Sequence, residues 1–284
     1  MATLGGLMCF GGARFEVFLT VHLPESAESQ CEEAVSGPAR APSAGDGSRG
    51  DDLGGRGSRA AWFASYISTI LQRDVRDLAR VDALHSLPNL LKLLAARASG
   101  LLNLADVGRD ASLPHTTLTR YLALLETVFL VHRLPAWSRN LGQRLVKAPK
   151  VHLVDTGLAC HLLGTDARRL SEDRPLLGRL LESFVVGELR KQVSWTDPRI
   201  ALHHFRTATG SEVDVVLEKP DGSVAAIEVK ASATVAASDF AALKALQDQL
   251  GKQFRAGVVL YLGDQTVPFG DQLWLVPLPP LWEH

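Results

Sequence analysis

The sequence predicts an α/β protein in which a helical, winged-helix-like segment precedes a mixed β-sheet flanked by helices. Two observations support this. Residues 104–134 show a helix, a turn and a second helix, and the chain from residue 176 onward alternates between helical and extended patterns. Hydrophobic residues make up 46% of the 284 residues and charged residues 21%, which are ordinary values for a globular chain and exclude a wholly disordered or fibrous protein.

Three parts follow one another along the chain. Residues 35–59 are rich in Gly, Ser, Pro and Arg and offer little to bury, so residues 1–60 are expected to be a flexible tail of low complexity. Residues 61–165 are expected to form the helical and winged-helix-like domain, and residues 170–284 the α/β domain.

Charge and cysteine content limit the partners and the compartment. The net charge is -1, so a nucleic acid would have to meet a local basic patch. The three cysteines show no paired spacing, which predicts neither a disulfide framework nor a zinc site. No apolar run approaches the roughly 18 residues that a membrane span needs. A cytoplasmic protein without a membrane partner is expected.

Apolar residues at helical spacing predict a helix from residue 62 to 78 and a second one over 87–98. A turn at residues 112–114 then separates two further helices, the second with Leu118 and Tyr121 on its apolar face. The extended pieces 129–134 and 144–154 come next, as the wing of a winged helix requires.

In the second part, helices are expected over residues 176–192 and 238–250, and strands over 201–206, 212–217, 224–230, 257–262 and 272–277. The turn residues 219–222 favour a hairpin between the second and third strands. Alternation then places Val213, Val215 and Leu217 on one face and Asp214 on the other, opposite Glu228 and Lys230.

Asp214, Glu228 and Lys230 are the expected catalytic group on the strands. Two carboxylates that face each other across a strand pair repel unless a cation lies between them, and Mg²⁺ or Mn²⁺ is the expected occupant. Such an ion can polarise a phosphate and supply hydroxide, and Lys230 could orient the water or neutralise developing charge. An E-x-K pair also occurs by chance on solvated strand faces, so this alternative stays open.

The helix over 176–192 offers two further carboxylates, Glu182 and Glu188, which lie on different faces. Glu182 lies on the apolar side, whereas Glu188 has basic neighbours and is expected to be more exposed. Glu182 is therefore predicted to complete the catalytic and metal-binding group, although a purely structural role is an equal alternative.

These residues resemble the PD-(D/E)XK nuclease constellation, in which a helix Glu, a strand Asp and an E-x-K pair bind divalent metal. More widely, segments such as RLVKAPKVHLVDTGLACHLLG (144–164), GRLLESFVVGEL (178–189) and AIEVKAS (226–232) resemble the carboxy-terminal region of bacterial and archaeal AAA-type ATP-binding proteins. That region is known as domain of unknown function 4143, and the resemblance extends over nearly all of residues 62–284.

The resemblance implies a winged-helix lid followed by a restriction-endonuclease-like domain, normally preceded by a nucleotide-binding domain. Residues 1–61 contain no P-loop motif, so this chain is expected to have no ATP site and not to be an ATPase as it stands. The expected function is that of a Mg²⁺-dependent nuclease-like module acting on DNA. The alternative is a non-catalytic module that binds nucleic acid, an ATPase domain or another protein through an inactive nuclease fold.

Arg120, Lys147 and Lys150 lie around the expected recognition helix and wing, where phosphate contacts would be made. Solvated charges on a lid explain them equally well. The winged-helix hypothesis further predicts that residues 115–117 and Arg120 face outward while Leu118 and Tyr121 pack inward. Asp155 is expected to be a helix N-cap.

Overall fold

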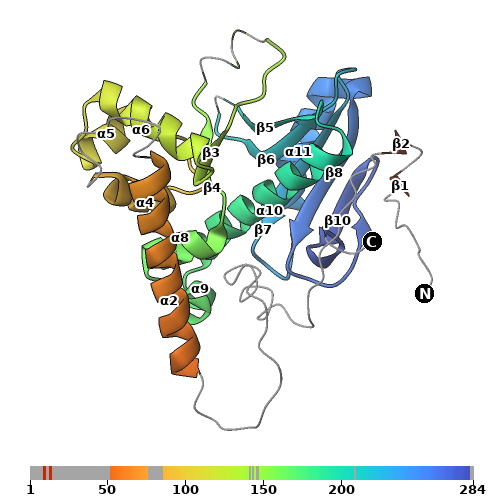
Figure 1. The fold of residues 1–284 in the computed structure, drawn as a ribbon. Helices are drawn as coiled ribbons and strands as arrows, with labels where there is room; N and C mark the ends of the chain where they lie inside the picture. Colours follow the sequence, from red (N-terminus) through yellow and green to blue (C-terminus); the bar gives the residue numbers. More distant parts are fainter. Residues whose placement is uncertain are drawn as a thin grey trace.

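The computed structural model describes residues 9–10, 13–14, 52–75, 86–140, 142, 144, 147–207 and 209–281. Figure 1 shows a helical part and a twisted sheet, with the long helix α10 running between them. Among the described residues, no helix is both long enough and apolar enough to cross a membrane.

Helix α2 (Asp52–Thr69) begins ten residues before the helix that we expected from residue 62, within the stretch expected to be a flexible tail. Ala60 and Ala61, inside this helix, are strong helix formers. The helix continues as the π-turn η1 (Ile70–Val75). Upstream, the two-residue strands β1 (Cys9–Phe10) and β2 (Ala13–Arg14) pair in an antiparallel manner.

The helical part has one core, formed by leucines of successive helices. Its further elements are α4 (Leu87–Ala96), α5 (Leu104–Asp110), α6 (His115–Thr127), β3 (Val131–Leu134), β4 (Lys150–Leu153), α8 (Thr156–Leu163) and α9 (Ala167–Glu172). Strands β3 and β4 pair in an antiparallel manner. The extended piece expected over 144–154 is shorter than predicted, because residues 142 and 144 are helical and the strand begins only at Lys150.

The second part is a mixed sheet of six strands in the order β5-β6-β7-β8-β10-β9. Its strands are β5 (Ala201–Arg206), β6 (Glu212–Glu218), β7 (Val224–Lys230), β8 (Phe254–Tyr261), β9 (Val267–Pro268) and β10 (Leu273–Pro277). The β7–β8 and β8–β10 pairs are parallel and the others are antiparallel. The 3₁₀ turns η3 (Ala237–Phe240), η4 (Gly251–Gln253) and η5 (Pro279–Leu281) lie in the connections and at the end.

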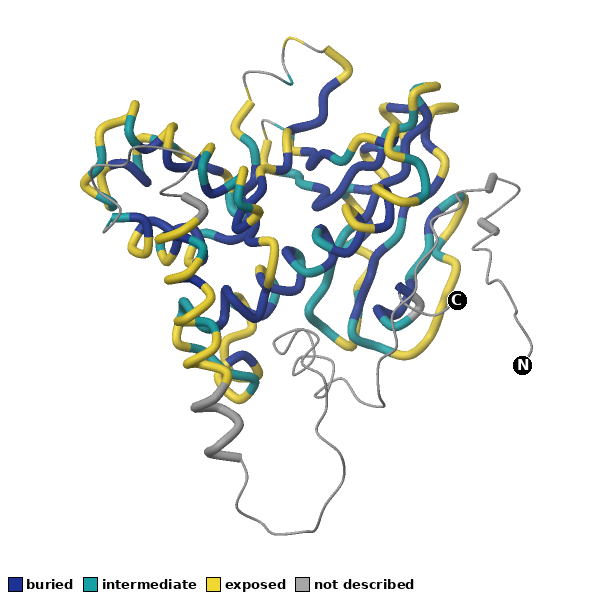
Figure 2. The backbone as a smooth tube through the Cα atoms, viewed as in Figure 1, coloured by how far each residue is buried: buried dark blue, intermediate teal, exposed yellow. Residues whose placement is uncertain are grey.

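Helices cover both faces of this sheet. Side chains of α10 (Arg174–Thr196) pack on one face, against Val215, Leu217 and Ile227. Those of α11 (Ala241–Leu250) pack on the other, against Val216 and Ala226. Figure 2 shows the resulting buried layer along α10 and the central strands.

The pairing of β5 with β6 contains a bulge next to Asp214. His203 pairs with Val216 but Phe205 pairs with Val213, so β6 has one extra residue in this interval. An extra residue reverses the alternation of side chains. Val213 therefore packs with the α11 side and not with Val215, contrary to the face assignment made from the sequence.

Candidate functional site

The centre of the candidate site is the ammonium group of Lys150, which lies at the start of β4. Its Nζ is 2.7 Å from Glu182 Oε1 on α10, 2.6 Å from Glu212 Oε1 on β6 and 3.2 Å from Asp214 Oδ1 on the same strand. The Lys150 side chain is only 3% exposed. Three segments distant in sequence are thus joined by one buried cation.

Glu228 and Lys230 lie beside this group, and Asp214 belongs to it. The predicted hairpin brings these three residues together. Strands β6 and β7 pair as far as Val215 and Ile227, and beyond this point Asp214 Oδ2 accepts a hydrogen bond from the Val229 backbone N–H at 2.9 Å. Glu228 Oε1 accepts one from Lys230 Nζ at 3.0 Å. The other oxygen, Glu228 Oε2, is buried and has no hydrogen-bond partner among the described residues.

The pKa values of this group are shifted by burial and by the carboxylates that lie close together. Burial, followed by the nearby Asp214 carboxylate, raises the pKa of Glu228 to about 7 and holds the pKa of Glu182 well above its usual range. Burial alone would lower the pKa of Lys150, but Asp214, Glu182 and Glu212 outweigh it and raise that pKa. Several carboxylates surround the single ammonium, which stabilises its charged form. Because they share this one cation, each carboxylate has less than one positive charge to balance it.

The charge count agrees with the pKa directions. Glu182, Glu212, Asp214 and Glu228 are four carboxyl groups, and they face the two ammonium groups of Lys150 and Lys230, which leaves an excess of two negative charges when all four are ionised. Including the next shell does not change this result, because Arg206 pairs with Glu212 at 3.1 Å and Asp239 lies 3.6 Å from Lys230. One divalent cation would balance the group.

Asp214 and Glu228 fit such an ion better than the whole set of carboxylates does. Among the described residues, no group of three or more His, Cys, Asp and Glu side chains is arranged to hold a metal ion as it stands. Lys150 already occupies the point where Glu182, Glu212 and Asp214 converge. Mg²⁺, however, is commonly held by one or two carboxylates and completed by water and phosphate, and the unpartnered Glu228 Oε2 is an oxygen of the required kind.

The structure decides between the two helix carboxylates. Glu182 joins the cluster, as predicted, and contacts Lys150 there. The expectation that Glu188 is more exposed is wrong: it is buried at 8% and pairs with Lys191 on its own helix. Both faces of α10 are covered, which is why basic neighbours in the sequence do not mark an exposed position.

Two residues of the cluster have roles that sequence analysis missed. Glu212 precedes Asp214 by two positions on β6, and this spacing was the available signal. Lys150 was expected to contact phosphates on the surface of a wing, and that placement is wrong, because its ammonium is buried among carboxylates. It begins β4, all four residues of which are buried, and a lysine there must be paired.

The other basic residues remain at the surface. Arg120 is exposed and lies 5.6 Å from the ring centre of Tyr121, and Lys147 is exposed as well. On α6, His115 and Thr116 are exposed and Leu118 and Tyr121 are buried, as predicted, whereas Thr117, which was also expected to face outward, is half-buried.

Asp155 is confirmed as the N-cap of α8, where its side chain accepts a hydrogen bond from the Leu158 N–H. His203 and His204 are buried, and burial lowers the pKa of both. His204 Nε2 lies 3.1 Å from the carbonyl oxygen of Ala148, which ties β5 to the segment before β4.

Comparisons with known proteins assign two family matches to this chain. Residues 177–281 match the family described as domain of unknown function 4143, and residues 53–169 match the one described as domain of unknown function 8612. The first match thus covers only the sheet part, whereas we expected it over nearly the whole of 62–284.

Two curated relatives are similar over both parts. They are the uncharacterized protein Rv2008c of Mycobacterium tuberculosis and the uncharacterized protein Mb2031c of Mycobacterium bovis, each 30% identical over 218 residues. The matched region covers 77% of this chain and 47% of each relative, so the chain spans about half the length of the curated relatives it matches. No solved structure gives a significant match.

Proposed function

We propose that the sheet part is a PD-(D/E)XK nuclease-like domain of the restriction-endonuclease type, which binds Mg²⁺ or Mn²⁺ through Asp214 and Glu228 and hydrolyses a phosphodiester of DNA. The observation that carries this proposal is the excess of two negative charges around a buried carboxylate oxygen without a partner, Glu228 Oε2. Perturbed carboxylates of this kind concentrate at functional sites.

The residues of this chain would divide the work as follows. The bound ion would polarise the scissile phosphate and lower the pKa of a water molecule. Lys230 holds Glu228 by a hydrogen bond and supplies positive charge next to the place where the phosphate would lie. Lys150 fixes Glu182 and Asp214, so that Asp214 stays in position when Glu228 changes its protonation state.

We further propose that α5, α6 and the β3–β4 pair form a winged helix that holds the DNA, with Arg120 and Lys147 near the phosphates. Support comes from the outward-facing start of α6 and the exposure of both basic residues. Changing both to alanine should remove about two phosphate contacts and flatten the plot of log K against log salt by roughly 1.8 units. Fluorescence anisotropy with a labelled duplex at several salt concentrations measures this slope. An unchanged slope would assign the helical part to contacts with protein.

The resemblance to the carboxy-terminal region of AAA-type ATP-binding proteins supports a place for this chain as the effector module of an ATPase.

A second function has its own supporting observation. Lys150 already forms ion pairs with three carboxylates, and Lys230 is paired with Glu228 and Asp239. A domain with its charges paired internally can also serve as a non-catalytic binding module.

The decisive experiment is calorimetry with Mn²⁺ at pH 8 together with a cleavage assay on single-stranded, double-stranded and branched DNA. Asp214→Asn should weaken the binding of Mn²⁺ at least tenfold and should remove EDTA-sensitive cleavage, because an amide oxygen is a poorer ligand than a carboxylate. Glu188→Gln is the matched control, since it alters an equally buried carboxylate that lies outside the cluster.

The same experiment separates the two functions. Binding of DNA without uptake of Mn²⁺ and without cleavage would establish the non-catalytic module. Equal Mn²⁺ affinity in the wild type and in Asp214→Asn would contradict the metal centre.

A further inference from the structure

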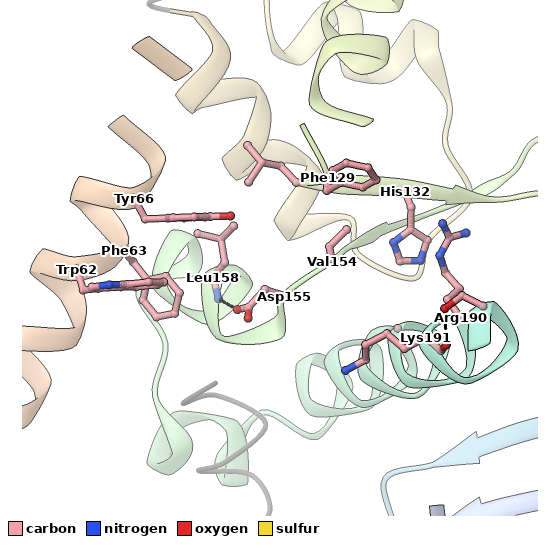
Figure 3. Close-up of a pocket in the computed structure, with 13 residues that line it drawn as sticks. Trp62, Phe63, Tyr66, Phe129, His132, Val154, Asp155, Leu158, Arg190 and Lys191 are labelled. Carbon is pink, nitrogen blue, oxygen red and sulfur yellow. Dashed lines mark hydrogen bonds between the residues drawn. The ribbon is translucent and has the colours of Figure 1, made fainter. Parts of the chain in front are cut away.

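A second site lies at the junction of the two parts. A cavity of about 600 Å³ opens between α2, the β3 and β4 strand ends, α8 and α10. Figure 3 shows Trp62, Phe63 and Tyr66 at one end of this cavity and His132 and Arg190 at the other. Its volume is within the range of pockets that bind small organic ligands.

One end of the cavity is an aromatic platform. The rings of Trp62 and Tyr66 are stacked with centres 5.2 Å apart and an interplanar angle of 5°, and Trp62 is 59% exposed. Exposure of a flat aromatic surface of this kind to water is unfavourable. A planar ligand that stacks on it would remove that surface from solvent.

Phe129 adds a third exposed ring, at a position where phenylalanine is unfavourable. It follows α6 with φ of +56°, a backbone conformation that favours glycine, and its side chain is 77% exposed. Exposure of a large apolar ring stabilises nothing in the folded chain, and neither does the strained backbone. Both features are explained if the ring contacts a ligand.

The opposite end of the cavity is polar and lacks partners. Both ring nitrogens of His132 are without a hydrogen bond among the described residues, although this side chain is only 6% exposed. Burial, with a further contribution from Arg190, lowers the pKa of His132 to about 3, so the ring is neutral and offers one donor and one acceptor. Leaving such a pair buried and unsatisfied is unfavourable.

Arg190 supplies the positive charge of this end. It is exposed at the surface of α10 and makes no hydrogen bond or ion pair with another described residue, because the nearby Glu126 is bound by Arg133 through both carboxylate oxygens. A guanidinium group with free donors is suited to a phosphate, which it can contact through two parallel hydrogen bonds.

We propose that this cavity binds a nucleotide unit, with the base stacked on the aromatic platform and the phosphate on Arg190. The combination of stacking rings with a free guanidinium is the one that nucleic-acid-binding proteins use for unpaired bases. Asp155 also borders the cavity, but its carboxylate caps α8 and already accepts a hydrogen bond there. The source is either a free nucleotide or a single strand of nucleic acid.

The position of the cavity relative to the carboxylate cluster favours the single strand. Gly187, Arg190 and Ser194 border the cavity from one face of α10, and Glu182 lies earlier on the same helix. Eight residues of α-helix correspond to about 12 Å along the axis, so Glu182 and Arg190 are separated by a distance that a short stretch of single strand can span. The choice of a single strand rests on the proposed function, whereas the cavity itself does not depend on metal and is tested separately from the metal centre.

The test is anisotropy of a fluorescent single-stranded oligonucleotide in EDTA, with the full chain and with AMP as competitor. Trp62→Ala should weaken binding roughly 5- to 150-fold, the range measured for loss of one base-stacking ring. Arg190→Gln should weaken binding and reduce its salt dependence. If AMP competes when its concentration is close to that of the binding sites, the ligand is a free nucleotide. If AMP fails to compete, the ligand is a single strand.

Two variants make the outcome specific. Trp195→Ala is the matched control, because Trp195 is exposed to the same extent as Trp62 but does not border the cavity. Phe129→Gly should raise the melting temperature by about 2–4 °C, since glycine accepts the positive φ, and should weaken binding at the same time. Absence of binding by the wild type to both probes, or an equal loss in Trp62→Ala and Trp195→Ala, would overturn the proposal.

Discussion

Replacing Lys150 by methionine is expected to lower the free energy of unfolding by about 3–5 kcal/mol, the usual cost of removing one partner from a buried ion pair. Methionine fills a similar volume, so the loss does not come from a cavity. It comes from Glu182, Glu212 and Asp214, which would remain at the same place without their shared cation. Chemical denaturation of both proteins at pH 7.5 measures the difference.

The control for this prediction is Lys147→Met, which changes an exposed lysine three positions away and should alter stability by less than about 0.5 kcal/mol. The pH dependence identifies the cause. In Lys150→Met the carboxylates are easier to protonate, so the loss should shrink as the pH falls toward 4. Mn²⁺ should also restore part of the stability if a divalent ion can replace the ammonium. A loss that is the same at every pH would contradict the electrostatic explanation.

The secondary structure of the sheet part could be predicted closely because its signals are local. Strand β5 was expected over 201–206 and is observed at Ala201–Arg206, and the turn at 219–222 fixes the β6–β7 hairpin. Such a turn sets the register of the strands by itself. No local sequence signal indicates the bulge next to Asp214, since neither glycine nor proline marks it. The bulge and the resulting orientation of Val213 were therefore not predicted.

The site was predicted only where its residues share one element or one hairpin. Asp214, Glu228 and Lys230 follow from alternation on two paired strands. Lys150 could not be placed in this way, because its contacts join β4 to α10 and β6 across more than 30 positions of sequence. The aromatic cavity could not be predicted for the same reason, since Trp62, Phe129 and Arg190 come to border it only through the packing of α2, α6 and α10.

Glu228→Gln is expected to stabilise the protein at pH 8 by up to about 3 kcal/mol while it removes a proposed metal ligand. The folded-state pKa of Glu228 is about 7, against an ordinary value of 4.5. Between these two values the unfolded chain loses the proton and the folded chain keeps it, so stability falls as the pH rises through this window. A shift of this size corresponds to about 3 kcal/mol, and the variant has no charge to bury.

Denaturation at pH 4 and at pH 8, with and without Mn²⁺, separates this effect from general changes in packing. At pH 4 both states of the wild type are largely protonated, and the variant should show little advantage. At pH 8 Mn²⁺ should raise the stability of the wild type but not that of Glu228→Gln, because the ion binds the ionised carboxylate in competition with the proton. A variant less stable than the wild type at pH 8 would mean that Lys230 already compensates Glu228 fully, and the excess charge would then have to be assigned to Glu182. A carboxylate that weakens the fold at neutral pH is what the proposed metal site requires, because stability is often lower where a residue serves binding.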